Sequence, residues 1–592
     1  MMMEAKERSA EMAPDRQPCT ENGGRVQILL RRPLPLRYWH EVREQCAMAG
    51  PVFLSQIMVF LINFVSSIFC GHLGKIELDS VTLAVAVINV TGISVGSGLA
   101  SACDTLMSQT YGGKNLKRVG TILQRGILIL LLCCFPCWAL FINTEQLLLL
   151  CRQNPNVARL TQTYVMIFTP ALPAVFLYQL QTRYLQNQGI IWPQVITGLG
   201  VNIINAAVNA ILMYGLKLGV QGSAWANTIS QFAMSGVLYI YIIWKNLHLL
   251  TWGGWSRDCI QEWGSFIRLA IPSMLMVCIE WWSFEIGGFL AGLISVVELG
   301  AQAIMLELAT AAYMVSVGFS VAASVRIGNA LGAGDVEQAK TSCKVSLLCI
   351  VFCAVLTSSL MAGLKDVIAY VFTTDREIVV LVSHLMLIFA PFHLCDAVAG
   401  TCAGILRGTG KQKIGAITNA VGYYLLGLPI GISLMFAVKL GVIGLWSGLI
   451  FPVFLQASFF VVYVLRMNWD KVCEEAQVRA GVQKEDKQDK DKRPSISLME
   501  TDITGFVTVP NGELDAGFSA VDQGIYAGAA ILPDAPFSEN HSEHLVLQEE
   551  ASNIVGDVLS TKQLILRRGL VCCLAVTVLL TGVLIRVFTG NG

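Results

Sequence analysis

Charged residues are scarce in this sequence. They make up 14% of the chain, whereas a typical soluble domain contains about 25%. Hydrophobic residues reach 54%, and they are grouped in many blocks of about 20 residues, the length that a helix needs to cross the hydrocarbon core of a bilayer. This composition excludes a soluble globular protein and indicates an all-α integral membrane protein.

Motifs for catalysis and metal binding are also missing. The chain has 18 cysteines but only 7 histidines, and no pair of them has the spacing of a zinc site. Most cysteines lie inside apolar blocks, where a free cysteine packs as a small hydrophobic residue. No nucleophile constellation and no phosphate-binding loop is recognisable. We therefore expect no enzymatic activity, no metal, no cofactor and no nucleic-acid partner.

The apolar blocks predict twelve membrane helices in the main body and a thirteenth, over 569–588, near the C-terminus. The twelve predicted spans are 46–70, 80–105, 119–142, 160–182, 192–214, 222–245, 265–293, 299–322, 341–363, 378–404, 413–436 and 441–466. We expect residues 46–245 to form one six-helix bundle and residues 265–466 a second, joined by a cytoplasmic linker over 246–264.

The segments outside the bundles are polar. Residues 1–45 contain no apolar core of a cleavable signal peptide, so we expect a cytoplasmic N-terminal segment followed by a first span that directs insertion. Residues 467–566 contain a mixed charge run and then polar, Gly-rich sequence. That composition predicts a disordered cytoplasmic loop, which offers a place for regulatory proteins to bind.

Lysine and arginine are concentrated in alternate connections between the spans. Examples are Arg118 after the second span, Arg326 after the eighth, and Arg407 and Lys411 after the tenth. Because basic residues favour the cytoplasmic side of a membrane, we expect the N-terminus to be cytoplasmic. Thirteen crossings then place the C-terminus outside the cell.

The two halves of the body repeat one another. Pro51 and Pro272 (272 − 51 = 221), Glu77 and Glu298 (298 − 77 = 221), Gly113 and Gly334 (334 − 113 = 221), and Gly189 and Gly410 (410 − 189 = 221) form matched pairs in one register. The repeat predicts two bundles of parallel topology. Such duplication is typical of secondary transporters, which carry substrate by alternating access between repeats.

Two carboxylates, Glu280 and Glu285, lie in the bilayer-length stretch from Ile271 to Leu290. An acid inside the membrane is costly to bury and by default indicates a functional site. Subtraction of 221 gives Val59 and Phe64 in the first half, so the shared scaffold does not require the acids. The pair is five residues apart, roughly 140° around a helix, and cannot share one narrow face. We rank Glu280 first because it is nearer mid-span.

Three more polar side chains lie within second-half spans. Glu307 is in the eighth span, and His393 and Asp396 are three residues apart in the tenth, which predicts that they share a helix face. His393 is a candidate for a proton relay, because histidine titrates near neutral pH. In the first half, Asp104 and Gln109 end the second span, where we expect them to be solvated.

These acids suggest a coupling mechanism. A carboxylate in a low-dielectric environment binds a proton more readily than one in water, and a nearby cation displaces that proton. One site with two mutually exclusive occupants is the basis of proton/cation antiport. Trp281, Trp282 and Tyr313 are candidates to hold an organic cation by cation–π contact.

The chain resembles the multidrug and toxin extrusion (MATE) transporters. The stretches that carry the resemblance are Gly50-Pro51, Gly71-His72-Leu73-Gly74, Gln109-Thr110-Tyr111-Gly112, Glu280-Trp281-Trp282, Arg326 to Gly334 and Gly404 to Gly410. The C-terminal span and its long tether are similar to the vertebrate kidney and liver branch. The resemblance implies the MATE-type fold, and roles in transport for Glu280, Glu285, Glu307 and Asp396, the last being Glu in close vertebrate relatives. Prokaryotic members often carry an Asp in the first span, where this chain has Ser66.

The resemblance further implies multidrug efflux, with organic cations exchanged for protons and no cofactor besides the proton gradient. It places the chain in the plasma membrane, at the apical surface of epithelial cells, and we expect it to function as a monomer. A sodium-coupled exporter is the nearest alternative. A lipid-precursor flippase would need a basic central cavity, and a membrane receptor or scaffold would not need the repeat.

Overall fold

The computed structural model describes residues 36–71, 74–482 and 559–590. The described part contains 13 helical segments that are long and apolar enough to cross a membrane, which confirms the predicted spans. The first six come from α2 (Leu36–Gly71), α3 (Lys75–Ile88), η1 (Asn89–Ile93), α4 (Ser94–Ala100), α5 (Ala102–Gly112), α6 (Leu116–Ile142), α8 (Pro155–Phe168), η2 (Thr169–Ala171), α9 (Leu172–Asn187), α10 (Trp192–Asn209), η3 (Ala210–Gly215) and α11 (Val220–Trp244), with a short α7 (Thr144–Leu150).

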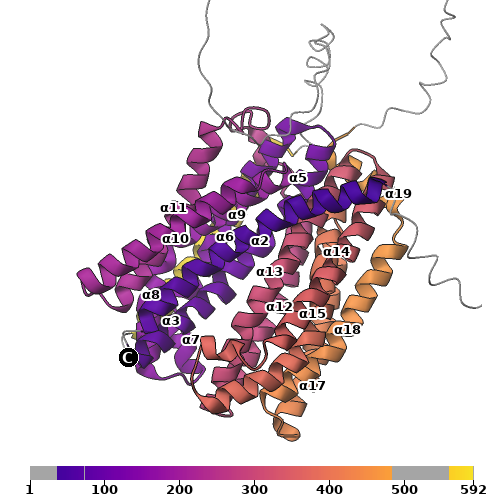
Figure 1. Cartoon of the computed structure of the whole chain (residues 1–592). Helices are drawn as coiled ribbons and strands as arrows, with labels where there is room; N and C mark the ends of the chain where they lie inside the picture. The colour runs from indigo at the N-terminus through magenta and orange to yellow at the C-terminus, as the bar shows by residue number, and fades with distance from the viewer. Residues whose placement is uncertain (1–35, 72–73, 483–558, 591–592) are drawn as a thin grey trace, which may run out of the picture.

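The second six spans begin after a linker that contains the short helix η4 (Arg257–Ile260). They are formed by α12 (Trp263–Gly292), α13 (Val296–Gly332), α14 (Val336–Gly363), η5 (Ile368–Val371), α15 (Arg376–Thr409), α16 (Gln412–Asn419), η6 (Ala420–Gly427), α17 (Leu428–Ile432), η7 (Ser433–Ala437) and α18 (Val442–Arg466). Two further helices, α19 (Trp469–Ala480) and α21 (Thr561–Gly590), follow. Figure 1 shows the two halves as adjacent lobes, with α19 near one end and the C-terminus at the other.

Several helices extend beyond the predicted ends. The first begins at Leu36, ten residues before the predicted span that starts at 46; residues 1–35 lie outside the described residues. The last begins at Thr561 rather than at 569. In each case polar residues continue an apolar helix past the hydrocarbon core, and hydropathy alone does not detect such extensions.

The prediction of a disordered loop over 467–566 is wrong at its beginning, because residues 469–480 form α19. The Asn468 side chain caps this helix by accepting a bond from the Lys471 amide at 3.1 Å, and Gly481 ends it with φ 75°. Its apolar face, which includes Trp469 and Val472, is buried. Residues 483–558 of the predicted loop lie outside the described residues.

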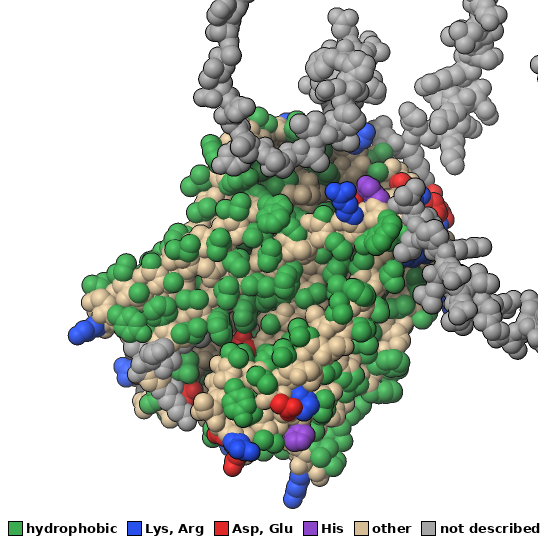
Figure 2. Space-filling view, viewed as in Figure 1, with side chains coloured by type: hydrophobic (Ala, Val, Ile, Leu, Met, Phe, Trp, Pro, Cys, Tyr) green, Lys and Arg blue, Asp and Glu red, His purple; other side chains and the backbone are tan. Residues whose placement is uncertain are grey.

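The surface has the charge distribution of a membrane protein. In the view of Figure 2, hydrophobic side chains form a broad band, and most charged side chains lie toward its two ends. Because a bilayer interior accommodates apolar side chains and excludes charge, this band marks the part of the surface that faces lipid. The chain is therefore a multi-pass membrane protein.

The lobes contact one another mainly in the half of the molecule nearest α19. There the backbones of α5 and α13 approach closely, and a Cβ on Gly332 would collide with the Gln109 carbonyl. Gln109 Nε2 donates to the Gly408 carbonyl at 2.9 Å, and Thr105 Oγ1 donates to the Arg407 carbonyl at 2.6 Å. Gln109 is fully buried and Asp104 nearly so. The prediction that these two side chains are solvated is wrong, because the second lobe covers them.

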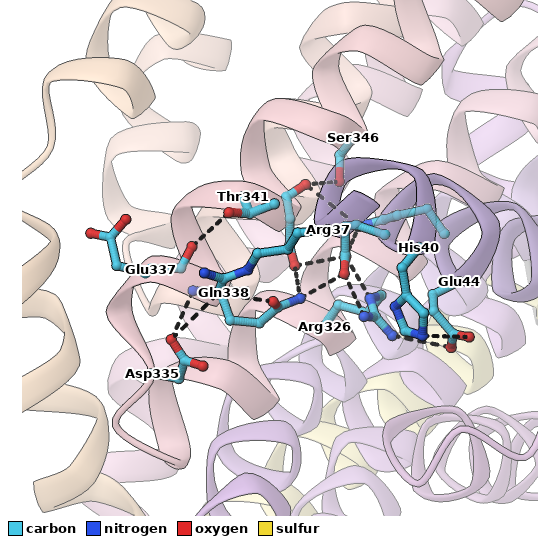
Figure 3. A network of polar contacts seen from close by, with 12 residues as sticks. Arg37, His40, Glu44, Arg326, Asp335, Glu337, Gln338, Thr341 and Ser346 are labelled. Atoms are coloured by element: carbon cyan, nitrogen blue, oxygen red, sulfur yellow. Dashed lines mark hydrogen bonds and ion pairs between the residues drawn. The ribbon is translucent and has the colours of Figure 1, made fainter. Parts of the chain in front are cut away.

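A polar network also joins the lobes at the α19 end (Figure 3). Glu41 of α2 is 1% exposed, and its carboxylate pairs with the Arg326 guanidinium of α13, one bond being 2.6 Å. The same carboxylate accepts bonds from Gln338 Nε2 at 2.6 Å and Ser342 Oγ at 2.7 Å, both from α14. We call these four residues the Glu41 network. With the close α5–α13 contact, it closes the interface between the lobes at this end.

Candidate functional site

Glu280 occupies the middle of α12, which packs between the two lobes against α4, α13 and α16. The Tyr313 hydroxyl of α13 lies beside the Glu280 carboxylate, close enough to interact with it. Tyr313, predicted from sequence as a cation-binding aromatic, is therefore placed directly at the acid ranked first.

Glu280 and Asp396 line the same cavity. It has a volume of about 10 Å³, the lower limit for a single water molecule. Asn419, Tyr423 and Gln456 supply the other polar side chains of its wall. Two carboxylates at one small cavity compete for protons, because ionisation of either one opposes ionisation of the other.

The carboxamides beside these acids are ordered by hydrogen bonds. Gln456 Nε2 donates to Asn419 Oδ1 at 2.8 Å, and Asn419 Nδ2 donates to the Met276 carbonyl of α12 at 2.9 Å. Gln456 Oε1 is buried and has no hydrogen-bond partner among the described residues. This oxygen lies next to Gly422 of η6, where an added Cβ would be 2.8 Å from it.

Tyr423 is the main residue at the site that the sequence did not indicate. Its hydroxyl lies close enough to Asp396 to interact with it, and its ring lies at the edge of an aromatic cluster that includes Phe284, 6.0 Å away. Tyr423 belongs to the π-helical segment η6. A π-turn inserts an extra residue into a helix and so changes the direction of the side chains around it, and a regular helical period cannot predict such a change.

Arg407 links this site to the other lobe. Its Nε lies 3.7 Å from Asp104 Oδ2, and its Nη2 donates to Ser320 Oγ at 2.8 Å. Arg183 of α9 approaches the same Asp104 oxygen at 3.4 Å. Arg407 was predicted to be a basic loop residue, but its side chain is only 13% exposed, because α15 extends to Thr409.

The remaining acids of the prediction form a separate pair. Glu285 and Glu307 lie near enough to interact electrostatically, on the facing helices α12 and α13. Neither lines the cavity of Glu280 and Asp396. Glu307 is exposed on the protein surface, whereas Glu285 is half-buried.

His393 and Asp396 contact different neighbours. The His393 ring is buried, stacks on Phe389 with a centroid distance of 5.6 Å, and its Nε2 lies 2.9 Å from Thr357 Oγ1 of α14. A three-residue step turns a helix by about 60°, and α15 packs against both α14 and α18. That rotation directs His393 toward α14, whereas Asp396 faces the cavity that it shares with Glu280.

The two tryptophans of α12 also differ. Trp282 is partly exposed, and its Nε1 donates to the Val90 carbonyl of η1 at 3.0 Å. This bond joins the lobes farther from α19 than the contacts of α5. Trp281 is half-buried one residue away, about 100° around the helix, and neither residue lines the cavity of Glu280.

The first lobe contains a cluster of amide and hydroxyl side chains among its spans. Asn209 Nδ2 lies 3.3 Å from Ser66 Oγ, and Asn205 Nδ2 donates to Ser230 Oγ at 3.0 Å. Asn227 donates to the Tyr164 hydroxyl at 3.1 Å. This polar core is neutral; the acids that are buried in the first lobe, Glu41 and Asp104, lie instead at the interface with the second lobe.

Comparison with known proteins divides the chain into the same two halves as the internal repeat. A family model described as MatE matches residues 51–211 and 272–432. The two matches are displaced by 221 residues at both ends (272 − 51 = 221 and 432 − 211 = 221), which confirms the register of the internal repeat.

Curated relatives are similar over nearly their whole length. Multidrug and toxin extrusion protein 2 of Mus musculus is 59% identical over 574 residues, covering 96% of this chain and 96% of the relative. Multidrug and toxin extrusion protein 1 of Homo sapiens is 54% identical over 549 residues, covering 93% and 94%.

Solved structures share the fold. The crystal structure of the eukaryotic MATE transporter AtDTX14 has a TM-score of 0.73 and 29% identity, and the match covers 75% of this chain and all of that one. A mutant of the Vibrio cholerae MATE transporter VcmN has a TM-score of 0.67 at 15% identity, covering 74% of this chain and 99% of its own.

Two repeated six-helix lobes, with Glu280 and Asp396 at one cavity of the second lobe, define a two-lobed secondary transporter, not an enzyme. The matches over both repeats and the full-length relatives then specify the group within that class. The chain belongs to the MatE family.

Proposed function

We propose that this chain exports organic cations in exchange for protons, with Glu280 and Asp396 as the exchange site. The observation that carries the proposal is the cavity that the two acids share, where Glu280 lies beside Tyr313 and Asp396 beside Tyr423. Either protons or a cation can neutralise the two carboxylates. The relatives named multidrug and toxin extrusion proteins support cargo of this kind.

The closed α19 end suggests the order of events. In this conformation the site exchanges with the opposite side of the membrane, where protons neutralise the acids and displace the cation. Separation of the lobes at the α19 end then lets the protons leave and a new cation bind. The present cavity of about 10 Å³ is far below the roughly 300 Å³ of a small ligand site, so cation binding requires movement of the surrounding helices.

The other predicted residues take supporting roles in this mechanism. Glu285 and Glu307 form a second acidic pair that attracts cations toward α12 and α13. Trp281 and Trp282 lie where the lobes separate and contact cargo there, while Tyr313 contacts it at the acid. His393 bonds Thr357 and positions α15 against α14, away from the path of the proton.

Orientation and location are part of the proposal. Basic residues at the α19 end assign it to the cytoplasm, and the end of α21 then faces outside. We expect a monomer in the apical plasma membrane of epithelial cells, with residues 483–558 available to regulatory proteins. Epitope tags at the two termini, tested in intact and permeabilised cells, check this orientation; accessibility of both tags in intact cells would contradict it.

Transport into reconstituted vesicles tests the coupling. Vesicles with an acidic interior and an alkaline exterior should accumulate a labelled tetraalkylammonium ion, and a proton ionophore should abolish the accumulation. Sodium is the main alternative coupling ion, because carboxylate and amide side chains line the cavity. If protons drive transport, a sodium gradient alone should give no accumulation. Accumulation driven by sodium and not by protons would overturn the proposal.

A further inference from the structure

A second cavity lies in the first lobe, away from the acids. Its volume is about 720 Å³, within the roughly 300–1,000 Å³ of sites for small ligands. Helices α6, α9 and α11 form its walls, and the linker after α11 forms one end. The labels of these three helices lie close together in Figure 1.

Each wall contributes one face of a helix. From α9 come Pro173, Leu177, Leu180 and Tyr184, and from α11 come Phe232, Gly236, Tyr239 and Ile243, both at the spacing of three or four residues that aligns side chains along a helix. Phe232, Tyr239 and Ile243 are exposed. In a membrane, this side of the cavity opens to lipid.

The end formed by the linker is polar but uncharged. Gln181 Oε1 and His248 Nδ1 are buried and have no hydrogen-bond partner among the described residues, and both side chains line the cavity. Trp252 and Trp255 lie beside them with perpendicular rings 5.7 Å apart. Buried polar atoms without partners are costly, so a ligand hydroxyl, which can both donate and accept a hydrogen bond, would stabilise this end.

The lining excludes several membrane ligands. Of the described residues that form it, none is Asp, Glu, Lys or Arg. A phospholipid phosphate or a fatty-acid carboxylate would lack a cationic partner, and an organic cation would have only aromatic faces here, without a carboxylate to neutralise its charge. The ligand is therefore a neutral amphiphile with a large apolar body.

We propose that this cavity binds a membrane sterol, with the hydroxyl at Gln181 and His248 and the ring system against the faces of α9 and α11. A rigid ring system loses less conformational entropy on binding than the flexible chains of a diacylglycerol. Val237, Tyr239 and Lys245 on α11 also fit a short pattern suggested for cholesterol contact, which is a weak signal by itself. This site is independent of the exchange site of Glu280.

Gly236 provides a test that leaves the fold intact. A Cβ added to it meets nothing within 4 Å, and the same holds for Gly200 on α10, which does not line the cavity. Gly236→Leu fills the cavity, and Gly200→Leu is the matched control. Gln181→Leu removes one acceptor, which should weaken binding about tenfold.

The experiment uses a photoreactive cholesterol analogue with the full-length protein in phosphatidylcholine vesicles. We expect labelling of peptides from α9, α11 or the linker, competition by unlabelled cholesterol, loss in Gly236→Leu and no loss in Gly200→Leu. Equal labelling in the two glycine variants would overturn the proposal. Labelling of the same peptides by photoreactive phosphatidylcholine or a photoreactive organic cation, without competition by cholesterol, would overturn it in favour of that ligand.

Discussion

Arg407 of the second lobe and Asp104 of the first face each other across the lobe interface, with Nε and Oδ2 3.7 Å apart. Arg407 also lies close enough to Glu280 and Tyr313 to interact with them electrostatically. A single guanidinium therefore connects the exchange site with the closed contact between the lobes. Protonation of Glu280 removes its negative charge, so Arg407 is then attracted mainly by Asp104. The protonation state of the exchange site can therefore change the strength of the contact between the lobes.

Asp104→Asn should destabilise the closed interface. It leaves Arg407 and Arg183 largely buried without the carboxylate that both approach, and breaking a buried ion pair costs about 3–5 kcal/mol. We expect a lower melting temperature for the purified protein and faster hydrogen exchange in α5. Asp79→Asn is the control, because Asp79 is exposed. Equal melting temperatures for the two variants would show that Asp104 does not stabilise this interface.

Glu41→Gln should loosen the α19 end. Glu41 is buried and accepts bonds from Arg326, Gln338 and Ser342, so the amide leaves Arg326 without its main counter-charge. We expect increased hydrogen exchange in peptides from α2 and the start of α14. Glu337→Gln is the control, because it removes only an exposed pair with Lys340, and exposed pairs contribute little. Similar hydrogen exchange in both variants would show that the Glu41 network does not hold the lobes together at this end.

Glu280→Gln should abolish transport while the protein still reaches the cell surface. The amide keeps the size of the side chain but cannot alternate between a proton and a cation. Glu307→Gln should retain a larger part of the activity, because Glu307 is exposed and lies outside the cavity. Uptake of a labelled organic cation, normalised to surface protein, checks both variants. Near-normal uptake by Glu280→Gln would place the exchange site elsewhere.

The sequence predicted the parts of this architecture that depend on local composition. Hydropathy located the spans, and the 221-residue register showed that Val59 replaces Glu280 in the first lobe. The chain also contains contacts that no local pattern specifies. Tyr423 reaches Asp396 through the π-turn of η6, and Arg407 is buried because α15 extends past the membrane. Both depend on which helices become neighbours.

The same limit explains why α19 was missed. Its stretch contains acidic and basic residues in alternation, a composition typical of a solvated tether. The helix is stable because its apolar face packs on the lobes and its polar face pairs with them. Arg479 Nε donates to Gln109 Oε1 of α5 at 2.9 Å, and its Nη2 donates to the Thr409 carbonyl of α15 at 3.2 Å. The two lobes together create the surface on which α19 folds.

Docking of α19 should weaken in acid. Partial burial opposes ionisation of Glu475, but the Lys411 ammonium, 2.7 Å from its carboxylate, holds the pKa of Glu475 below its ordinary value. A carboxyl whose pKa is lowered in the folded state stabilises that state above its unfolded pKa, about 4.3, and the stabilisation is lost as the pH falls through the folded pKa. The protection factors of residues 469–480, which correct hydrogen exchange for its intrinsic pH dependence, should therefore be constant near neutral pH and should fall below about pH 4. In Glu475→Gln the exchange should already be faster at neutral pH, with a smaller change on acidification. An unchanged acid response in that variant would assign the pH dependence to another carboxylate.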